Sequence, residues 1–220
     1  MPTTVSIVIT NFNREAYLPR AIRSCLDQIL FSPITFEIIV VDDGSSDNST
    51  EMLNMFSGQI KLLKHEDNRG VAAASNTGIR AASGEFIIRL DADDFLNRFS
   101  VYMLSQILIE NPEIGFVYTD HFRVDEKGYK QEKVILNTDE KIYDHGAGIM
   151  YRKEVFDNVG SYDEELRNCE DFDFFARVMK IYKGFHLPLP LYRYYIHGEN
   201  ISLDEDRVGY KNLVRERYDF

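Results

Sequence analysis

The 220-residue chain has little of what marks secreted, disulfide-bonded or membrane-spanning proteins. It contains no tryptophan and only two cysteines, Cys25 and Cys169, which are too few for a disulfide framework and are typical of reduced cytosolic thiols. The amino terminus, MPTTVSIVIT, lacks the basic segment and the long apolar segment of a signal peptide. No apolar run approaches the ~18 residues of a membrane-spanning helix. These absences predict a cytoplasmic protein without a transmembrane segment, and they leave peripheral contact with the inner face of a membrane open.

Positive charge is also scarce, because 25 lysines and arginines are outnumbered by 36 aspartates and glutamates, for a formal net charge of -11. Such a surface repels nucleic acid, so no nucleic-acid partner is expected, and an anionic substrate needs a local cation. The fingerprints G-x-G-x-x-G and G-x-x-x-x-G-K-[ST] are missing, which disfavours dinucleotide oxidoreductases and P-loop enzymes. The apolar content of 44% and charged content of 28% predict one ordinary globular domain.

In the first half of the chain, apolar runs typical of buried strands alternate with segments of helical periodicity. We expect strands over residues 5–10, 36–41, 60–65 and 86–90, and helices over residues 16–28, 47–56 and 71–82. Ser46 or Asp47 is expected to cap the second of these helices. Strand–helix alternation with short loops predicts parallel βαβ units, whose strands are buried on both faces. The predicted fold class is α/β, with a mostly parallel sheet flanked by helices.

The second half is less regular and predicts a mixed sheet. Helices are expected over residues 100–109, 155–160 and 171–182, strands over residues 114–119, 146–151 and 185–196, and a charged helical tail over residues 204–220. Residues 123–142 suggest a hairpin or a long excursion. Pro188 and Pro190 place the last strand at a sheet edge, because proline cannot donate to a strand ladder.

Four polar clusters follow the predicted parallel strands: Thr10–Asn11, Asp42–Asp43, Glu66–Gly70 and Asp91–Asp94. Ligands of such sheets bind beyond the carboxyl ends of the strands, so these clusters are expected to share one rim. Three carboxylates within Asp91–Asp94 repel one another and favour a bound divalent cation. A helix-capping loop is the structural alternative at this position.

In this order, the elements of the chain resemble the family 2 glycosyltransferases of the GT-A fold. The resemblance runs from Val5 to about Ser202 and rests on the ordered set VSIVITNFNREAYL, IIVVDDGSSDNST, DNRGVAAASNTGI, GEFIIRLDADD, GAGIMYRKEVFDNVGSYDEEL, CEDFDFFAR and YRYYIHGENIS. It implies a Rossmann-like GT-A domain spanning residues 1–220. Residues 1–98 would form the nucleotide-sugar-binding half, residues 99–203 the acceptor and catalytic half, and residues 204–220 a carboxyl-terminal tail.

The resemblance assigns a metal site to the acidic cluster. Asp91-Ala92-Asp93 looks like the family's DxD motif, in which Asp93 would coordinate Mn²⁺ or Mg²⁺ and Asp91 would contact the ribose or the metal. His197 looks like the histidine that some relatives place on the metal or the diphosphate. The chemistry agrees, because the leaving nucleoside diphosphate carries charge that a Lewis-acid metal neutralises. A lone histidine is, however, more often a surface or core residue.

The resemblance also implies a nucleotide site at the first strands. Asp43 looks like the family aspartate that accepts the N3–H of a uracil-type base, which suits a carboxylate because it cannot donate. Thr10 and Phe12 would flank the base, and Asn68 and Gly70 would lie near the nucleotide. Alternatively, Asp43 only shapes the Asp-Asp-Gly-Ser turn.

One departure from the family pattern bears on the donor base. Many relatives carry arginine where this chain has Ser75, so a contact to the nucleotide is missing. Arg69 or Arg80 is expected to compensate for it, although Arg80 could equally be a solvated helix residue.

Glu170-Asp171 looks like the family's ED motif, in which Asp171 would be the general base that deprotonates the acceptor hydroxyl. Such a base typically contributes ~10²–10⁴-fold to the rate. The alternative is acidic charge favoured at a helix amino terminus. Asp173 lies in the same turn, and motif position alone favours Asp171.

The predicted function is metal-dependent, inverting transfer of a hexosyl or N-acetylhexosaminyl group from a nucleotide sugar, with UDP-sugars favoured. A saccharide or lipid-linked saccharide would accept the sugar, in surface polysaccharide or glycoconjugate synthesis. Two other hypotheses stay open at this point. A sugar-phosphate nucleotidyltransferase should carry a glycine-rich, basic phosphate loop near the amino terminus, where this chain reads TNFNREAY. A non-catalytic nucleotide-sugar-binding subunit is disfavoured by the intact DxD and ED motifs.

Overall fold

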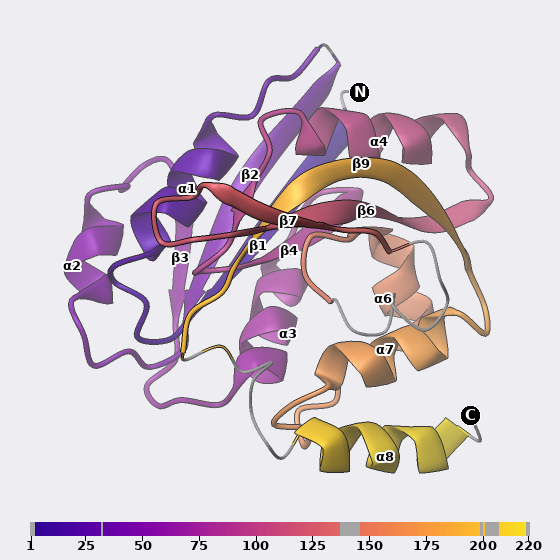
Figure 1. Cartoon of the computed structure of the whole chain (residues 1–220). Coiled ribbons are helices and arrows are strands. Elements are labelled where there is room, and N and C mark those ends of the chain that lie inside the picture. Colours follow the sequence, from indigo (N-terminus) through magenta and orange to yellow (C-terminus); the bar gives the residue numbers. More distant parts are fainter. Residues whose placement is uncertain (1–2, 32, 137–145, 199, 201–206, 219–220) are drawn as a thin grey trace.

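The computed structural model of the chain describes residues 3–31, 33–136, 146–198, 200 and 207–218. Its centre is a mixed sheet with the strand order β3-β2-β1-β4-β8-β6-β9-β5, in which β7 pairs with β6 (Figure 1). Helices cover both faces of this sheet, and the helix that ends the described chain packs outside α7.

The first half consists of parallel βαβ units, as the apolar periodicity predicted. Its elements are β1 (Thr3–Asn11), α1 (Leu18–Leu26), β2 (Ile34–Asp42), α2 (Ser49–Asn54), β3 (Lys61–Lys64), α3 (Val71–Ala81) and β4 (Phe86–Asp91). The strand β1 pairs in parallel with β2 and β4, and β2 pairs in parallel with β3. A Cβ on Gly78 of α3 would overlap the Val8 side chain, so this glycine lets α3 lie close to β1.

The second half is mixed, also as predicted. Its elements are β5 (Phe95–Leu96), α4 (Ser100–Glu110), β6 (Ile114–Val124), β7 (Lys130–Val134), β8 (Met150–Arg152), α6 (Lys153–Val159), α7 (Glu170–Val178), β9 (Lys183–Tyr195) and α8 (Arg207–Tyr218). The strand β8 runs antiparallel to both β4 and β6, whereas β9 runs parallel to β6. The strands β6 and β7 form the hairpin that was one reading of residues 123–142, of which 137–142 lie outside the described residues.

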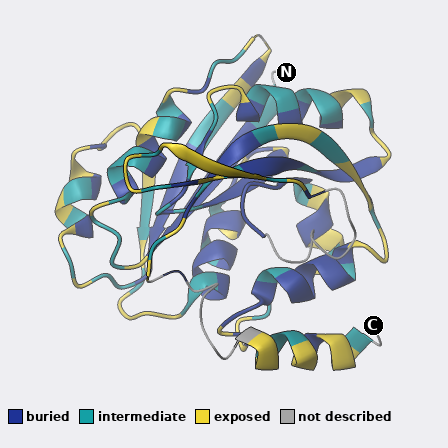
Figure 2. Ribbon diagram, viewed as in Figure 1, coloured by how far each residue is buried: buried dark blue, intermediate teal, exposed yellow. Residues whose placement is uncertain are grey.

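Two hydrophobic cores hold the layers together, one on each face of the sheet. One core packs α1 and α4 against one face of the sheet, and includes side chains such as Leu18, Leu104 and Ile7. The other packs α3, α6 and α7 against the opposite face, with Val8 and Phe174 among its fully buried members. Burial is deepest in the sheet and shallowest on β7 and α8 (Figure 2). Burial on both faces explains why the parallel strands have continuous apolar sequences.

Three local predictions need correction. The strand β9 is not an edge strand over its whole length, because β5 pairs with Tyr192 and Arg193 on the side opposite β6. The two prolines lie before that pairing, at an irregularity in the β6–β9 register, where a missing N–H costs least. The helix predicted over residues 171–182 ends at Val178, and the cap position of α2 is Asn48. Asp47 nevertheless accepts the Ser49 N–H at 3.0 Å, which is the bonding expected of a capping carboxylate.

Candidate active site

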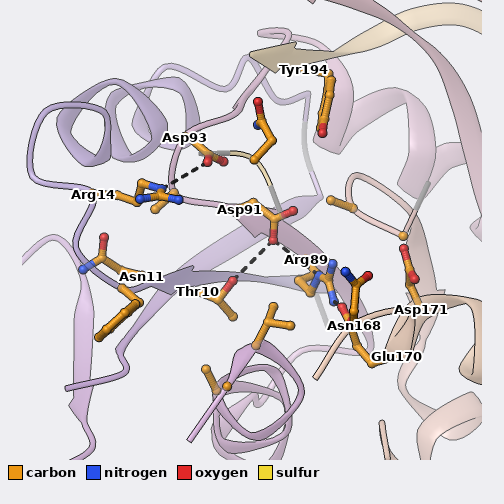
Figure 3. A pocket seen from close by; sticks show the side chains of 18 of the residues that line it. Thr10, Asn11, Arg14, Arg89, Asp91, Asp93, Asn168, Glu170, Asp171 and Tyr194 are labelled. Carbon is orange, nitrogen blue, oxygen red and sulfur yellow. Dashed lines mark hydrogen bonds and ion pairs between the residues drawn. The ribbon is translucent and has the colours of Figure 1, made fainter. Parts of the chain in front are cut away.

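A cavity of about 1060 Å³ opens at the carboxyl ends of β1, β2 and β4 and extends to α7 and the β6–β7 hairpin. Eight of the nine residues to which the sequence assigned a catalytic, donor-binding or metal role line it: Thr10, Phe12, Asp43, Asn68, Gly70, Asp91, Asp93 and Asp171. The ninth, His197, reaches the same place by its contact with Asp93. In Figure 3, Asp91 lies between the Arg14–Asp93 pair and the α7 residues Glu170 and Asp171.

The side chain of Asp93 forms one end of the cavity. Its Oδ2 accepts from Nε of Arg14 at 3.3 Å and lies 3.0 Å from Nε2 of His197. The backbone is held as well, because Arg20 of α1 donates to the Asp93 carbonyl at 3.0 Å. Asp93 of the DxD motif and His197 are 104 positions apart in the chain, and they meet at one carboxylate oxygen.

A divalent cation fits this pair. Among the described residues, no group of three or more His, Cys, Asp or Glu side chains forms a complete metal cage. Mg²⁺, however, is usually bound by one or two carboxylates together with substrate phosphates, so a complete protein cage is not required. The Asp93 carboxylate and the His197 imidazole, 3.0 Å apart, supply two ligands of the appropriate kind on one side of an open cavity.

Asp94, the third carboxylate of the cluster, has a structural role. It is 1% exposed, accepts the Tyr195 N–H at 2.8 Å and also accepts a hydrogen bond from the Tyr192 hydroxyl. Burial and the neighbouring carboxylates Asp93 and Asp91 raise its pKa well above the ordinary value. The bonds of Asp94 thus tie the loop after β4 to β9.

A buried arginine on β4 connects the two acidic clusters. Nη1 of Arg89 donates to Glu170 at 2.9 Å, and its Nε lies 3.7 Å from Oδ1 of Asp91. Burial alone would lower the pKa of Arg89, but Asp91 and Glu170 outweigh it and raise that pKa well above the ordinary value. Loss of hydration in turn raises the pKa of Asp91, and Arg89 opposes this effect. Glu170 is therefore held as the partner of a buried cation.

Asp43 lies at the nucleotide end that the resemblance predicted. Its carboxylate accepts the backbone N–H groups of Arg69 at 3.0 Å and Gly70 at 2.8 Å, and contacts Nδ1 of His65 at 2.5 Å. These bonds fold the loop before α3 around Asp43, whereas the alternative reading had Asp43 shape the Asp-Asp-Gly-Ser turn, in which the Ser45 hydroxyl donates to Asp42 instead. A carboxylate has about four acceptor sites, so Oδ2 retains room for one more donor from the cavity.

Asp171 lies at the opposite end of the cavity, in the first turn of α7. Its Oδ1 accepts its neighbour's N–H at 2.8 Å, and the side chain packs so closely on Gly146 that any Cβ there would overlap it. Asp173 points elsewhere: it is 1% exposed and binds Arg177 at 2.8 Å and the Tyr218 hydroxyl of α8 at 2.9 Å. Within this acidic turn, Asp171 lines the cavity and Asp173 holds α8.

The compensation expected from Arg69 and Arg80 is not seen. Both side chains bind Glu164 on the outside of α3, at 3.0 Å and 3.8 Å, and neither lines the cavity. Sequence reasoning missed four other arginines that do line it: Arg14, Arg89, Arg123 and Arg167. The one available signal was Arg89, a charged residue within the apolar run of a central strand, since such a residue is almost never buried unless it is paired.

Comparison with known proteins agrees with this geometry. The model of the family "Glycosyl transferase family 2" matches residues 6–162. The hyaluronan synthase of Pasteurella multocida is 27% identical over 222 residues, which cover 94% of this chain and 22% of that protein. The chondroitin synthase of Escherichia coli is 26% identical over 96% of this chain and 32% of its own length. The minor teichoic acid biosynthesis protein GgaA of Bacillus subtilis is 28% identical over 79% of this chain and 43% of its own length.

Solved structures show the same fold. Residues 1–349 of S. aureus TarS, in complex with UDP-GlcNAc, superpose with a TM-score of 0.78 at 23% identity, covering 97% of this chain and 66% of that one. The mannosyltransferase PcManGT of Pyrobaculum calidifontis, in complex with GDP-Man and Mn²⁺, gives a TM-score of 0.70 at 16% identity, covering 91% and 59%. The fold is therefore that of the GT-A class.

The chain belongs to glycosyltransferase family 2, because the family model matches more than half of its length. It spans 22% to 32% of the length of the hyaluronan and chondroitin synthases that it resembles. Among the described residues, no helix has the length and apolar character needed to cross a bilayer.

Proposed function

We propose that this chain is a metal-dependent, inverting glycosyltransferase domain that uses a nucleotide sugar, with UDP-sugars as the expected donors. The observation that carries the proposal is the meeting of three predicted groups in one cavity: Asp43 at one end, the Asp93–His197 pair, and Asp171 on α7. The sugar would be a hexosyl or N-acetylhexosaminyl group, and the acceptor a hydroxyl of a saccharide or lipid-linked saccharide. The names of the relatives, which include synthases of two polysaccharides, support this acceptor class.

The donor would lie along the carboxyl ends of β1, β2 and β4. Asp43 would accept the N3–H of the base, with Thr10 and Phe12 beside the ring and Asn68 and Gly70 near the nucleoside. Asp91, whose carboxylate receives the Thr10 hydroxyl at 3.4 Å, would contact the ribose or the metal.

Asp93 and His197 would hold Mn²⁺ or Mg²⁺ together with the diphosphate of the donor. When bound, the cation neutralises the charge that grows on the leaving diphosphate, an effect of several kcal/mol in metal-assisted reactions. Arg14 lies 3.3 Å from the same Asp93 carboxylate and places a second positive charge beside the leaving group.

Asp171 would act as the general base. The acceptor hydroxyl oxygen forms the new bond to the anomeric carbon, its proton passes to Asp171, and the bond from that carbon to the diphosphate oxygen breaks. One displacement of this kind inverts the anomeric configuration. The position of Asp171 on the far side of Asp91 from the Arg14–Asp93 pair suits attack from the face opposite the leaving group (Figure 3).

Binding and product analysis test this proposal. In a thermal-shift panel with Mn²⁺, a UDP-sugar at 100-fold over its Kd should stabilise the protein by about 2.7 kcal/mol, and GDP-, CDP- and ADP-sugars should do less. Incubation with the stabilising donor and saccharide acceptors should release UDP. In a parallel incubation with UTP and a sugar 1-phosphate, release of pyrophosphate would indicate a nucleotidyltransferase. Tight donor binding without transfer of the sugar to any acceptor or to water would indicate a binding subunit.

A further inference from the structure

An arginine beside the nucleotide end of the cavity has no assigned role. Arg167 precedes α7, lines the cavity and is exposed. Its Nη1 lies 3.2 Å from the position that a Cβ on Gly70 would take, so the guanidinium packs over this glycine, which has a φ of +94°. Within the described part of the chain, Arg167 makes no hydrogen bond or ion pair, although the cavity that it lines contains Asp43, Asp91 and Asp171.

The place of Arg167 follows from how its loop is attached to α3. Asn76 of α3 is 1% exposed and makes two bonds with the backbone of Tyr162, donating to its carbonyl at 2.9 Å and accepting its N–H at 3.0 Å. The same amide donates to Glu164 at 3.0 Å. Leu166 is then buried against Val214 of α8. These anchors, which all precede Arg167 in the loop, set it over the amino terminus of α3.

Two neighbouring arginines show what an ordinary surface arginine does here. Arg69 and Arg80, before and within α3, both turn outward and pair with Glu164. Arg167 is three positions away from this carboxylate, yet it lies over Gly70 instead. Arg167 therefore puts a positive charge at the rim of an acidic cavity, and within the described residues no carboxylate pairs with it. In a chain of net charge -11, such a charge is available to bind a ligand.

The chemistry of this end of the cavity selects the ligand. Gly70 donates its N–H to Oδ2 of Asp43 at 2.8 Å, so Arg167 and Asp43 are separated by a single residue. A carboxylate that accepts and a guanidinium that donates, side by side, complement the edge of uracil, where N3–H lies between two carbonyl oxygens. In the same pose, cytosine would present its N3 acceptor to the Asp43 carboxylate, which also accepts, so this arrangement favours uracil at position 3.

We propose that Arg167 is a further donor-binding residue, which donates to a carbonyl oxygen of the uracil base whose N3–H is accepted by Asp43. It supplies from the loop before α7 the guanidinium that Ser75 does not supply from α3. This inference rests on the proposed use of a uridine nucleotide, and it adds a second residue that binds the base beside Asp43.

Calorimetric titration of three single variants tests it, with two ligands that separate base from phosphate. Wild type, R167Q, R69Q and R80Q are each titrated with UDP and with inorganic pyrophosphate in the presence of Mn²⁺. We expect R167Q to weaken UDP binding about ten-fold or more, because a hydrogen bond from a charged group is lost, and to leave pyrophosphate binding unchanged. The matched variants R69Q and R80Q should bind both ligands as wild type does.

Each other outcome overturns the inference in a recognisable way. Equal UDP affinity of R167Q and wild type shows that Arg167 does not contact the nucleotide, while the proposed donor class stands. Weakening of both UDP and pyrophosphate assigns Arg167 to the diphosphate instead of the base. Failure of the wild-type protein to bind UDP, with tighter binding of another nucleoside diphosphate, removes the proposed donor class and this inference together. Circular dichroism of R167Q checks that the fold is intact.

Discussion

The acidic cluster after β4 and the acidic turn that opens α7 have similar sequences, DADD and EDFD. In both, some carboxylates face the cavity and another is buried. In each cluster two carboxylates line the cavity, Asp91 and Asp93 in the first and Glu170 and Asp171 in the second. A neighbour is buried and bonded away from the cavity: Asp94 to β9, and Asp173 to α8. Carboxylates of the same type, one or two positions apart, therefore differ in role because the backbone turns them toward different partners.

The two clusters differ in what surrounds Asp93 and Asp171. Asp93 lies within 3.3 Å of two cationic or titratable nitrogens, from Arg14 and His197, which suits a group that shares a metal and a diphosphate. Asp171 packs against the backbone of Gly146. The proposed role of Asp171 is to accept a proton, and that of Asp93 is to hold a metal. This contrast predicts which property of the enzyme each substitution changes.

The largest expected loss of activity comes from a substitution in the first cluster, at Asp93. Asp93→Asn should lower the transfer rate by about 10³-fold or more, because the loss of a metal ligand removes several kcal/mol of stabilisation from the leaving group. Initial rates with the best UDP-sugar at saturating Mn²⁺ give the measurement. Asp93 is partly exposed, so the thermal midpoint should stay close to that of wild type. Wild-type turnover in this variant would move the metal site away from Asp93.

The second prediction concerns Asp171, the proposed general base. Asp171→Asn keeps the volume of the side chain but cannot take a proton, so the transfer rate should fall by about 10²-fold or more with unchanged donor affinity. The exposed Asp157 of α6 offers a matched Asp→Asn control, which should retain full activity. Glu170 is a poor control, since its carboxylate is bonded to the buried Arg89. Full activity of Asp171→Asn would assign the proton to another acceptor.

The buried neighbours should respond in stability. Asp94→Ala leaves the Tyr195 N–H and the Tyr192 hydroxyl without their acceptor in the core. Asp173→Ala removes the acceptor of the Tyr218 hydroxyl and the carboxylate partner of Arg177, which keeps its bonds to the Val159 and Ser161 carbonyls. Each should lower the free energy of unfolding by about 2 kcal/mol or more. Urea denaturation followed by circular dichroism measures it. If either variant is as stable as wild type but inactive, the division between lining and buried carboxylates is wrong for that cluster.

The smallest expected effect is at the far side of α7. Arg217 of α8 donates to Asp163 at 2.8 Å, and this bond lowers the pKa of the Asp163 carboxyl. A pKa that is lower in the folded chain than in the unfolded chain stabilises the fold at neutral pH, and this stabilisation is lost as the pH falls through the folded-state value. Arg217→Gln should raise that pKa toward the ordinary value, with a change in stability of about 1 kcal/mol or less. An NMR titration of the Asp163 carboxyl measures the shift, and an unchanged pKa would show that Arg217 is not its cause.

The parallel half of the fold was predictable because its strands are buried on both faces. Val5, Ile39 and Ile88 have essentially no exposure, so the strands appear in the sequence as continuous apolar runs, and their predicted ends lie within about two residues of the observed ones. Because ligands of parallel sheets bind beyond the carboxyl ends of the strands, Asp43 and Asp93 could be predicted to lie at one rim.

The contacts of the site were less predictable because they are made across long distances in sequence. The bond between Asp93 and His197 was expected only from the resemblance, and the pairing of Arg89 with Glu170, 81 positions apart, was not expected at all. No local pattern shows which of two nearby carboxylates a backbone will turn toward a cavity. The same limit explains why Arg69 and Arg80 were chosen over Arg167, whose position depends on the attachment of its loop to Asn76.

One pair of titrations tests most directly whether Asp93 serves donor binding and Asp171 serves proton transfer. Mn²⁺ and UDP are titrated by calorimetry into Asp93→Asn and Asp171→Asn, beside the wild-type protein. The account predicts that Mn²⁺-dependent binding of UDP is strongly weakened in Asp93→Asn and is within about two-fold of wild type in Asp171→Asn, since only the first cluster contacts the donor diphosphate. Equal affinities in the two variants, or weaker binding in Asp171→Asn than in Asp93→Asn, would contradict it.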